Sequence, residues 1–184
     1  MAAKQPGTRQ AITEAGFRLL SRNPGANLEQ IALAAGVTRA TLHRYYPSRA
    51  KLIAALALTA IREMDEAVER ASAGATTVAQ SLRDSLFALI PLGDRHGFLA
   101  HEDIQAEPEV EAAFERMRAE MLDWMEAAQT EGLFDPSLPA SWCVRSFDYL
   151  LYAAWESVRS EELTAKQAAQ MAWRTLAQGL GDTS

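Results

Sequence analysis

One short stretch of the chain carries side chains that could hydrogen-bond to the edges of DNA bases. Residues 28–52 read LEQIALAAGVTRATLHRYYPSRAKL. If Leu42 faces inward, a rotation of about 100° per helical residue turns cationic, hydroxyl and methyl side chains outward. These are Arg39, Ala40, Thr41, His43 and Arg44. Arginine can bridge O6 and N7 of guanine, and Thr or Ala methyl groups can contact the thymine methyl, so this face is predicted to read bases. The alternative is an ordinary solvated helix surface.

The same stretch has the pattern of two short helices joined by a tight turn. Gly36 interrupts the apolar pattern, and a glycine there permits the positive φ that such a turn requires. Ala32 is small enough to let the helices approach each other. Leu42, with either Tyr45 or Tyr46, would form the inner face of the second helix. This arrangement is a helix-turn-helix, whose second helix lies in the major groove of DNA.

Capping residues mark where these helices should begin. Asn27 with Gln30 three residues later predicts a capping box for the first helix. Thr38 is the natural cap of the second helix. After Pro47, Ser48 caps a long helix that we expect to run to about residue 72.

Charge is unevenly divided along the chain. The 184 residues have a net charge of -6, yet residues 1–53 hold eight Lys or Arg against two Glu, which leaves -12 for the remainder. Such a basic segment is typical of a DNA-binding head on an acidic body. Arg49 and Lys51 stand at the start of the long helix, where the helix dipole also favours anions, so we predict that they contact phosphate.

Residues 8–52 resemble the DNA-binding segment of TetR-family transcriptional regulators. The resemblance is carried by GVTRATLHRYYPSRAKL, because the family commonly shows a Gly-Val-Ser/Thr turn, then Thr-Leu-Tyr-x-His-Phe, then Ser-Lys-x-x-Leu. His43, Tyr45, Tyr46 and Arg49 depart from that pattern but keep a polar or cationic group. The resemblance implies that phosphate is bound by Thr38, Tyr45, Tyr46, Ser48, Arg49 and Lys51.

Alanine-rich composition and the absence of any alternating strand pattern predict an all-α chain. We expect a three-helix DNA-binding domain at residues 1–52, linked by the long fourth helix to an effector-binding and dimerisation domain at residues 53–184. Further helices are expected at about residues 77–92, 108–131, 139–159 and 164–179. No stretch resembles a membrane span or a signal peptide, and the single cysteine, Cys143, fits a reducing compartment, so a cytoplasmic location is expected.

The body is rich in bulky, adaptable apolar side chains. Three methionines at i, i+4 and i+8 beside Trp124 suit a deformable pocket, although ordinary core is the alternative for each residue. The resemblance implies that such a pocket binds a small effector that releases the protein from DNA. The predicted pocket residues are Leu86, Phe87, Ile90, Phe98, Met117, Met121, Trp124, Met125 and Phe147.

A small polar cluster lies near the predicted pocket in sequence. His96, His101, Glu102 and Asp103 could give the effector a polar contact or bind a metal, but an exposed cluster of charges at a helix end is the preferred interpretation. We therefore predict no metal and no cofactor.

The last two predicted helices have unusually small apolar faces. Small residues let helices approach closely, either inside one subunit or between two. The first face has Ala153, Ala154, Ser157 and Val158, and the second has Ala165, Ala168, Ala169, Ala172, Leu176 and Ala177. Because a helix-turn-helix gains affinity as a two-fold dimer, and because the resemblance implies dimerisation through the last two helices, we predict a homodimer through residues 140–180.

The sequence offers little for catalysis. It has no Ser-His-Asp order, Cys-His pair, CxxC, phosphate-binding glycine loop or HExxH, and only three histidines. An enzyme, or a helical binding protein that never touches DNA, is the competing class, but it would leave the basic head unexplained. The sequence predicts a sequence-specific DNA-binding transcriptional regulator, and the resemblance implies a repressor released from a palindromic operator by a small apolar or aromatic effector.

Overall fold

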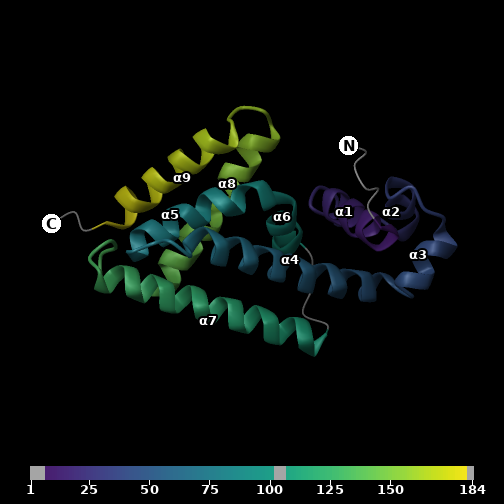
Figure 1. Ribbon diagram of the computed structural model, residues 1–184, viewed down its shortest axis with the longest axis horizontal. Helices are drawn as coiled ribbons and strands as arrows, with labels where there is room; N and C mark the ends of the chain where they lie inside the picture. Colours follow the sequence, from purple (N-terminus) through teal and green to yellow (C-terminus); the bar gives the residue numbers. More distant parts are fainter. Residues whose placement is uncertain (1–6, 102–106, 182–184) are drawn as a thin grey trace. The chain divides into compact units, whose positions relative to one another are not determined.

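The computed structural model describes residues 7–101 and 107–181, and every regular element within those ranges is helical (Figure 1). The predicted all-α class is confirmed. The elements are α1 (Thr8–Leu20), α2 (Leu28–Ala34), α3 (Arg39–Tyr45), α4 (Arg49–Ser72), α5 (Val78–Leu89), the 3₁₀ turn η1 (Ile90–Leu92), α6 (Gly93–His101), α7 (Pro108–Thr130), α8 (Ala140–Arg159) and α9 (Ala165–Leu180).

The chain folds as two compact units. The first comprises Met1–Ile61 and Asp94–Ala113, and the second comprises Arg62–Gly93 and Phe114–Ser184. Their boundaries differ from the predicted boundary at residue 52, because the first unit takes the beginning of α4, nearly all of α6 and the beginning of α7. The assignment of DNA binding to residues 1–52 and of effector binding to residues 53–184 stays a prediction.

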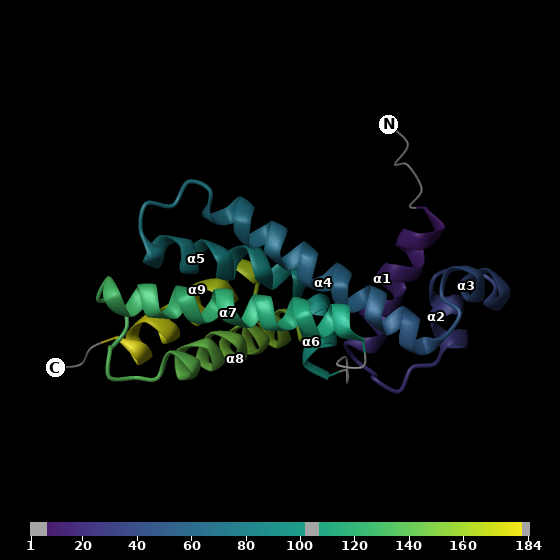
Figure 2. The ribbon, with the colours of Figure 1, turned by 90° about the horizontal axis from the view of Figure 1, so that it is seen from below.

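The helices α1, α2 and α3 of the first unit lie together (Figure 2). Their inward-facing apolar side chains form a buried core. Ile31 of α2, Leu42 of α3 and Leu52 of α4 are fully buried in it. Gly16 in the middle of α1 faces Leu56 of α4, and a Cβ at this position would lie 2.8 Å from Leu56 Cδ1. A glycine there permits the close approach of α1 and α4, which offsets its poor helix propensity.

The predicted turn and caps are confirmed. Gly36 has φ of +66°, the left-handed conformation that glycine adopts without strain. The Asn27 side chain accepts a hydrogen bond from the Gln30 backbone amide while the Gln30 side chain accepts one from the Asn27 amide. Thr38 caps α3, and the Ser48 hydroxyl accepts from the Lys51 amide at the start of α4. The helix-turn-helix is therefore specified by contacts within a few residues of each helix end.

Helix α6 supplies part of the core of the first unit. Phe98 is fully buried, and its ring meets that of Phe17 in α1 at 5.5 Å between centroids. The Ser21 hydroxyl donates to the Asp94 carboxylate at 3.3 Å. Arg95 forms an ion pair with Glu14, and its guanidinium lies 4.6 Å from the centre of the Phe17 ring. A segment more than seventy residues beyond α1 thus packs directly against it.

In the second unit α8 and α9 lie side by side, and α5 packs on α9 (Figure 1). The face of α8 that includes Cys143, Phe147 and Leu151 is buried. The start of α6 is held against α8, because a Cβ at Gly93 would lie only 1.4 Å from Trp155 Cδ1. Only glycine allows the backbone to come this close to the indole ring.

Part of the small-residue faces of α8 and α9 packs inside one subunit. Ala154, Ala168, Ala169 and Ala172 are all less than a tenth exposed in the single chain. For these four alanines the prediction of a surface between two subunits is corrected to close packing within one protomer. Ala153 and Ala165 of the same two faces are exposed, and the homodimer through residues 140–180 stays a prediction.

Residues 7–101 and 107–181 contain no helix that is both long enough and apolar enough to cross a membrane.

Candidate DNA-binding interface

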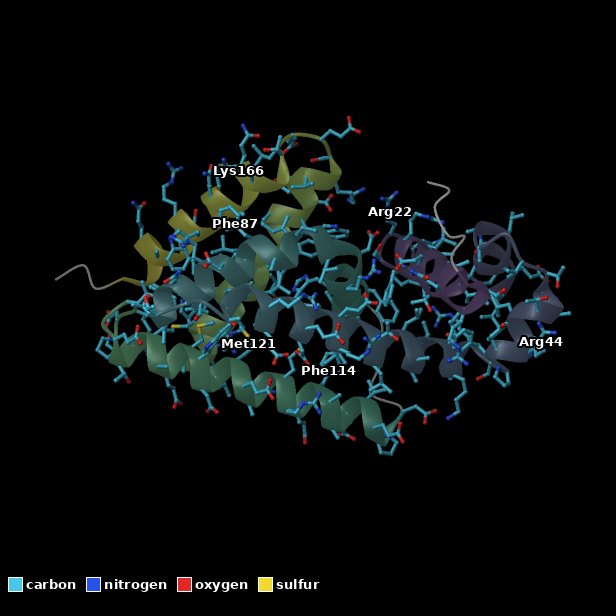
Figure 3. The ribbon with its side chains drawn as sticks, viewed as in Figure 1. Arg22, Arg44, Phe87, Phe114, Met121 and Lys166 are labelled. Carbon is cyan, nitrogen blue, oxygen red and sulfur yellow. The ribbon has the colours of Figure 1, made fainter. Side chains whose placement is uncertain are left out.

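Helix α3 presents a polar, cationic outer face. Leu42 is fully buried and holds the helix to the core. Arg39, Ala40, His43 and Arg44 are exposed on the opposite side, as predicted from helical periodicity. Figure 3 shows Arg44 projecting from α3 into open space. The geometry is suited to insertion of this face into a major groove, where guanidinium groups can reach base edges.

The hydroxyl of Thr41 is engaged at the start of α3. Thr41 Oγ1 lies 3.0 Å from Thr38 Oγ1, and the Thr41 amide donates to the same Thr38 oxygen at 3.1 Å. Thr38, predicted to bind phosphate, therefore caps the helix. The Thr41 side chain is half-buried, and its hydroxyl oxygen accepts a hydrogen bond from the Thr38 hydroxyl.

Arg39 is paired within the helix-turn-helix. Its Nη1 donates to Oε1 of Glu29 in α2, and both side chains remain mostly exposed, at 68% and 63% respectively. This pair links the first turn of α2 to the first residue of α3. The predicted base-reading guanidinium is thus held from one side by a carboxylate.

The two tyrosines at the end of α3 differ in exposure. Tyr46 is only 5% exposed, so its ring packs in the core. Of the two tyrosines, Tyr46 is therefore the one on the inner face of α3. Its burial revises its predicted role as a phosphate ligand. Tyr45 is half-buried. The guanidinium carbon of Arg9 lies 5.7 Å from the centre of the Tyr45 ring and 5.9 Å from that of Tyr46, and Arg44 lies 5.7 Å from Tyr45. These cation–π contacts bring a cation from α1 to the end of α3.

Arg49 has a structural role at the start of α4. Its guanidinium donates to the carbonyl oxygens of Pro24 and Ala26, in the loop that leads into α2. The side chain predicted to anchor phosphate therefore ties α4 to the loop before α2. Because these donors are used inside the protein, Arg49 is a weaker candidate for phosphate than the sequence suggested.

Lys51, the other predicted phosphate ligand on α4, forms an ion pair with Glu107. The Nζ to Oε1 distance is 2.8 Å, and the lysine side chain is 60% exposed. An exposed pair of this kind contributes about 0–1 kcal/mol and is readily exchanged for another anion. The phosphate contact of Lys51 stays a prediction, and it would have to displace the Glu107 carboxylate.

A match to known proteins decides the family. A sequence model of bacterial regulatory proteins of the tetR family matches residues 12–56, which contain the helix-turn-helix. The HTH-type transcriptional repressor LfrR of Mycolicibacterium smegmatis is 36% identical over 153 residues, which is 83% of this chain and 79% of LfrR. The chain belongs to the TetR family.

Solved structures of similar proteins have the same fold. The TetR-like regulator LfrR from Mycobacterium smegmatis, crystallised in complex with proflavine, superimposes with a TM-score of 0.77 at 31% identity, covering 95% of this chain and 97% of LfrR. The ketosteroid transcriptional regulator KstR2 of Mycobacterium tuberculosis has a TM-score of 0.76 at 17% identity, with 98% of both chains covered, a likeness of fold alone. TetR-family proteins are transcriptional regulators, so the chain is a DNA-binding regulator and the enzyme alternative is excluded.

Eight of the nine predicted effector-binding residues lie in the second unit of this TetR-family chain. Phe98 is the exception, because it packs against Phe17 in the first unit, and its role in effector binding stays a prediction. Among the other eight, some are buried, some are half-buried, and Phe87 is 36% exposed. Figure 3 shows Met121 on α7 directed toward the neighbouring helices of its unit. The buried residues are Leu86, Ile90, Met125 and Phe147, and the half-buried residues are Met117, Met121 and Trp124.

Two carboxylates of the second unit have shifted pKa values. Desolvation raises the pKa of Asp65 on α4; Glu120 raises it further, while Arg116 on α7 opposes the shift. Asp148 on α8 is accessible to water, yet the protein packed around it raises its pKa to about 6 by desolvation. Burial also raises the pKa of the Cys143 thiol, which agrees with the prediction of a buried small residue.

No group of three or more potential metal ligands occurs among the residues that the structure describes. His96 is half-buried in α6. The side chain of His101, and Glu102 and Asp103, lie outside the described residues, so their predicted cluster is not characterised.

Sequence reasoning missed three side chains at the interface. Glu29 and Arg9 contact the recognition helix, and Glu107 contacts Lys51. Glu29 could have been noticed as a carboxylate in the first turn of α2, which faces the same side as α3. Arg9 and Glu107 carry no local signal, because their contacts depend on how distant segments pack.

Proposed function

We propose that this TetR-family regulator is a repressor that binds a palindromic operator as a homodimer and releases it when a small aromatic molecule binds the second unit. The observation that carries the DNA-binding part is the outer face of α3. It combines two exposed arginines, His43 and the small Ala40 on a helix whose opposite side is fixed by buried Leu42. The similar protein LfrR is a transcriptional repressor, which supports repression rather than activation by this chain.

The homodimer is supported by apolar side chains on the outer faces of α8 and α9. Trp142 and Tyr149 on α8 are 51% and 73% exposed, and Met171 on α9 is 47% exposed. Large apolar side chains left exposed on two adjacent helices are typical of an interface. Because Ala154, Ala168, Ala169 and Ala172 are buried inside the subunit, the larger exposed residues, with exposed Ala153, are the proposed contact surface. A two-fold dimer would present two α3 helices to two half-sites.

The effector is proposed from the composition of the second unit and from a relative. Leu86, Met121, Trp124 and Phe147 offer aromatic and polarisable contacts for a flat apolar molecule. LfrR, at 31% identity, was crystallised with proflavine, which is aromatic. We infer that this chain also takes an aromatic ligand, in a pocket formed by the helices of the second unit.

Selection from a library of randomised duplexes tests the DNA-binding part. The full-length protein should enrich an inverted repeat whose half-sites are separated by about one helical turn. Sedimentation should then give two chains per bound duplex. Enrichment of a single half-site by a monomer would contradict the proposed homodimer but would still support sequence-specific DNA binding.

Titration with proflavine tests the switch on the selected duplex. A ligand shifts the equilibrium only if it binds the DNA-free state more tightly than the bound state. Proflavine should therefore quench tryptophan fluorescence and release the duplex over the same concentration range, and Trp124→Phe should remove most of the quench. If proflavine binds and operator affinity is unchanged, the proposed switch is wrong.

A further inference from the structure

The ion pair between Glu29 and Arg39 spans the two helices of the helix-turn-helix. Arg39 is the first residue of α3 and carries one of the two guanidinium groups on its outer face. Glu29 stands in the first turn of α2, and its Oε1 accepts a hydrogen bond from Arg39 Nη1. The carboxylate and the guanidinium both face solvent, on the side proposed to meet DNA.

Both ends of this pair rest on fixed backbone. The capping box between Asn27 and Gln30 fixes the first turn of α2, which carries Glu29. The hydroxyl of Thr38 caps α3 immediately before Arg39. An unrestrained arginine loses rotamer entropy when it is immobilised at a base. A partner that already restricts the guanidinium lowers that entropic cost.

A carboxylate at this position works against simple electrostatic attraction to DNA. Residues 1–53 contain only two acidic side chains, Glu14 and Glu29, and Glu14 is paired with Arg95. Glu29 therefore places a negative charge next to the recognition helix, where it must weaken nonspecific phosphate binding. It also competes with phosphate for Arg39, because phosphate contacts depend mainly on charge.

The Glu29 carboxylate weakens phosphate binding by Arg39, but it leaves Arg39 able to hydrogen-bond to guanine. Arginine has five N–H donors in a planar fork, so the bond from Nη1 to Glu29 leaves other donors for O6 and N7 of one guanine. We propose that Glu29 is the positioning residue for Arg39: it orients the guanidinium toward a guanine in each half-site and keeps it from the phosphates. This inference rests on the proposed entry of α3 into the major groove.

The test compares base preferences of full-length variants in the same randomised-duplex selection. Arg39→Ala should lose the preference for guanine at one base pair of each half-site by about 5- to 100-fold. Glu29→Ala should reduce the preference for guanine at that same base pair several-fold. The same variant should bind random duplex more tightly than the wild type. Glu29→Gln, which keeps an acceptor without the charge, should be intermediate. The double variant should be no less selective than Arg39→Ala alone.

Glu111→Ala is the matched control, because it removes one exposed carboxylate from α7 in the same unit. It should tighten random binding somewhat without changing any base preference. If Glu29→Ala behaves like Glu111→Ala, or if Arg39→Ala changes no base preference, the positioning role is overturned while DNA recognition stands. If the wild-type protein enriches no sequence, the proposed function itself fails.

Discussion

The ring of Phe98 in α6 meets the ring of Phe17 in α1 nearly at right angles, with centroids 5.5 Å apart and planes at 78°. Both rings are fully buried in the first unit. An edge-to-face pair of this kind adds about 0.5–1.5 kcal/mol beyond the apolar area it buries. The helix-turn-helix therefore rests on a core completed by a segment from the middle of the chain.

Phe98→Ala should destabilise the first unit although Phe98 lies far in sequence from the recognition helix. Removing a buried phenylalanine ring leaves a cavity and costs about 3–5 kcal/mol. Urea denaturation followed by circular dichroism should show that loss, and operator affinity should fall with it. Phe98→Leu fills most of the space and should cost less. Equal stability of the alanine variant and the wild type would contradict the packing of α6 against α1.

Gly93→Ala should destabilise the second unit. The new Cβ would lie 1.4 Å from Trp155 Cδ1, so the backbone or the indole ring has to move. We expect a loss of more than about 2 kcal/mol in the free energy of unfolding, at the upper end for overpacking. Gly179→Ala is the control, because a Cβ there meets nothing within 4 Å and should raise helix stability by up to about 1 kcal/mol. Similar effects of both changes would rule out the close contact at Trp155.

Asp148→Asn should stabilise the protein at neutral pH. The pKa of Asp148 is raised from 3.8 to about 6 in the folded protein, so the folded state favours the protonated form. Stability from this group is therefore present at low pH and is lost as the pH rises from about 4 to 6. Since solvent screens an accessible carboxylate, the gain at pH 7 should be about 1 kcal/mol.

Thermal denaturation between pH 4 and pH 7 measures this effect. The wild type should lose stability relative to Asp148→Asn across that range, and the two should converge at the acidic end. Asp123→Asn, which removes an exposed carboxylate from α7, should show no comparable gain. A constant difference at every pH would mean that the asparagine acts through packing rather than through the ionisation of Asp148.

Tyr149→Glu should dissociate the proposed dimer without unfolding the chain. Tyr149 is 73% exposed in the single subunit, so a charge there is tolerated until a partner covers it. Sedimentation should show monomers with unchanged helix content. Ala172→Glu is a contrasting variant, because Ala172 of α9 is buried within the single subunit and a charge there should unfold this region. A Tyr149→Glu variant that remains dimeric would place the interface elsewhere.

The helix-turn-helix could be predicted in detail because its signals are local. The positive φ of Gly36 and the reciprocal bonds of Asn27 and Gln30 depend on residues within one turn of each other. The outer face of α3 follows from helical periodicity once Leu42 is known to be buried. The family pattern added phosphate ligands, of which Thr38 and Arg49 prove to have intramolecular partners.

Long-range packing could not be predicted from the same signals. A buried phenylalanine reveals only that it needs an apolar environment, so the sequence does not reveal that Phe17 is the partner of Phe98. Small residues such as Ala172 permit close packing within or between subunits, and the sequence does not distinguish the two. The pairing of Arg39 with Glu29 required two helices to be placed before their side chains could be matched.

Binding of the wild type and of Arg44→Ala to the selected operator and to a random duplex, at two salt concentrations, tests the central claim most directly. Arg44 is exposed on α3 and projects away from the core (Figure 3). The wild type should bind both duplexes with a steep salt dependence. Arg44→Ala should lose about 1–3 kcal/mol on the operator and little on the random duplex. Equal losses on both duplexes would contradict base reading by α3.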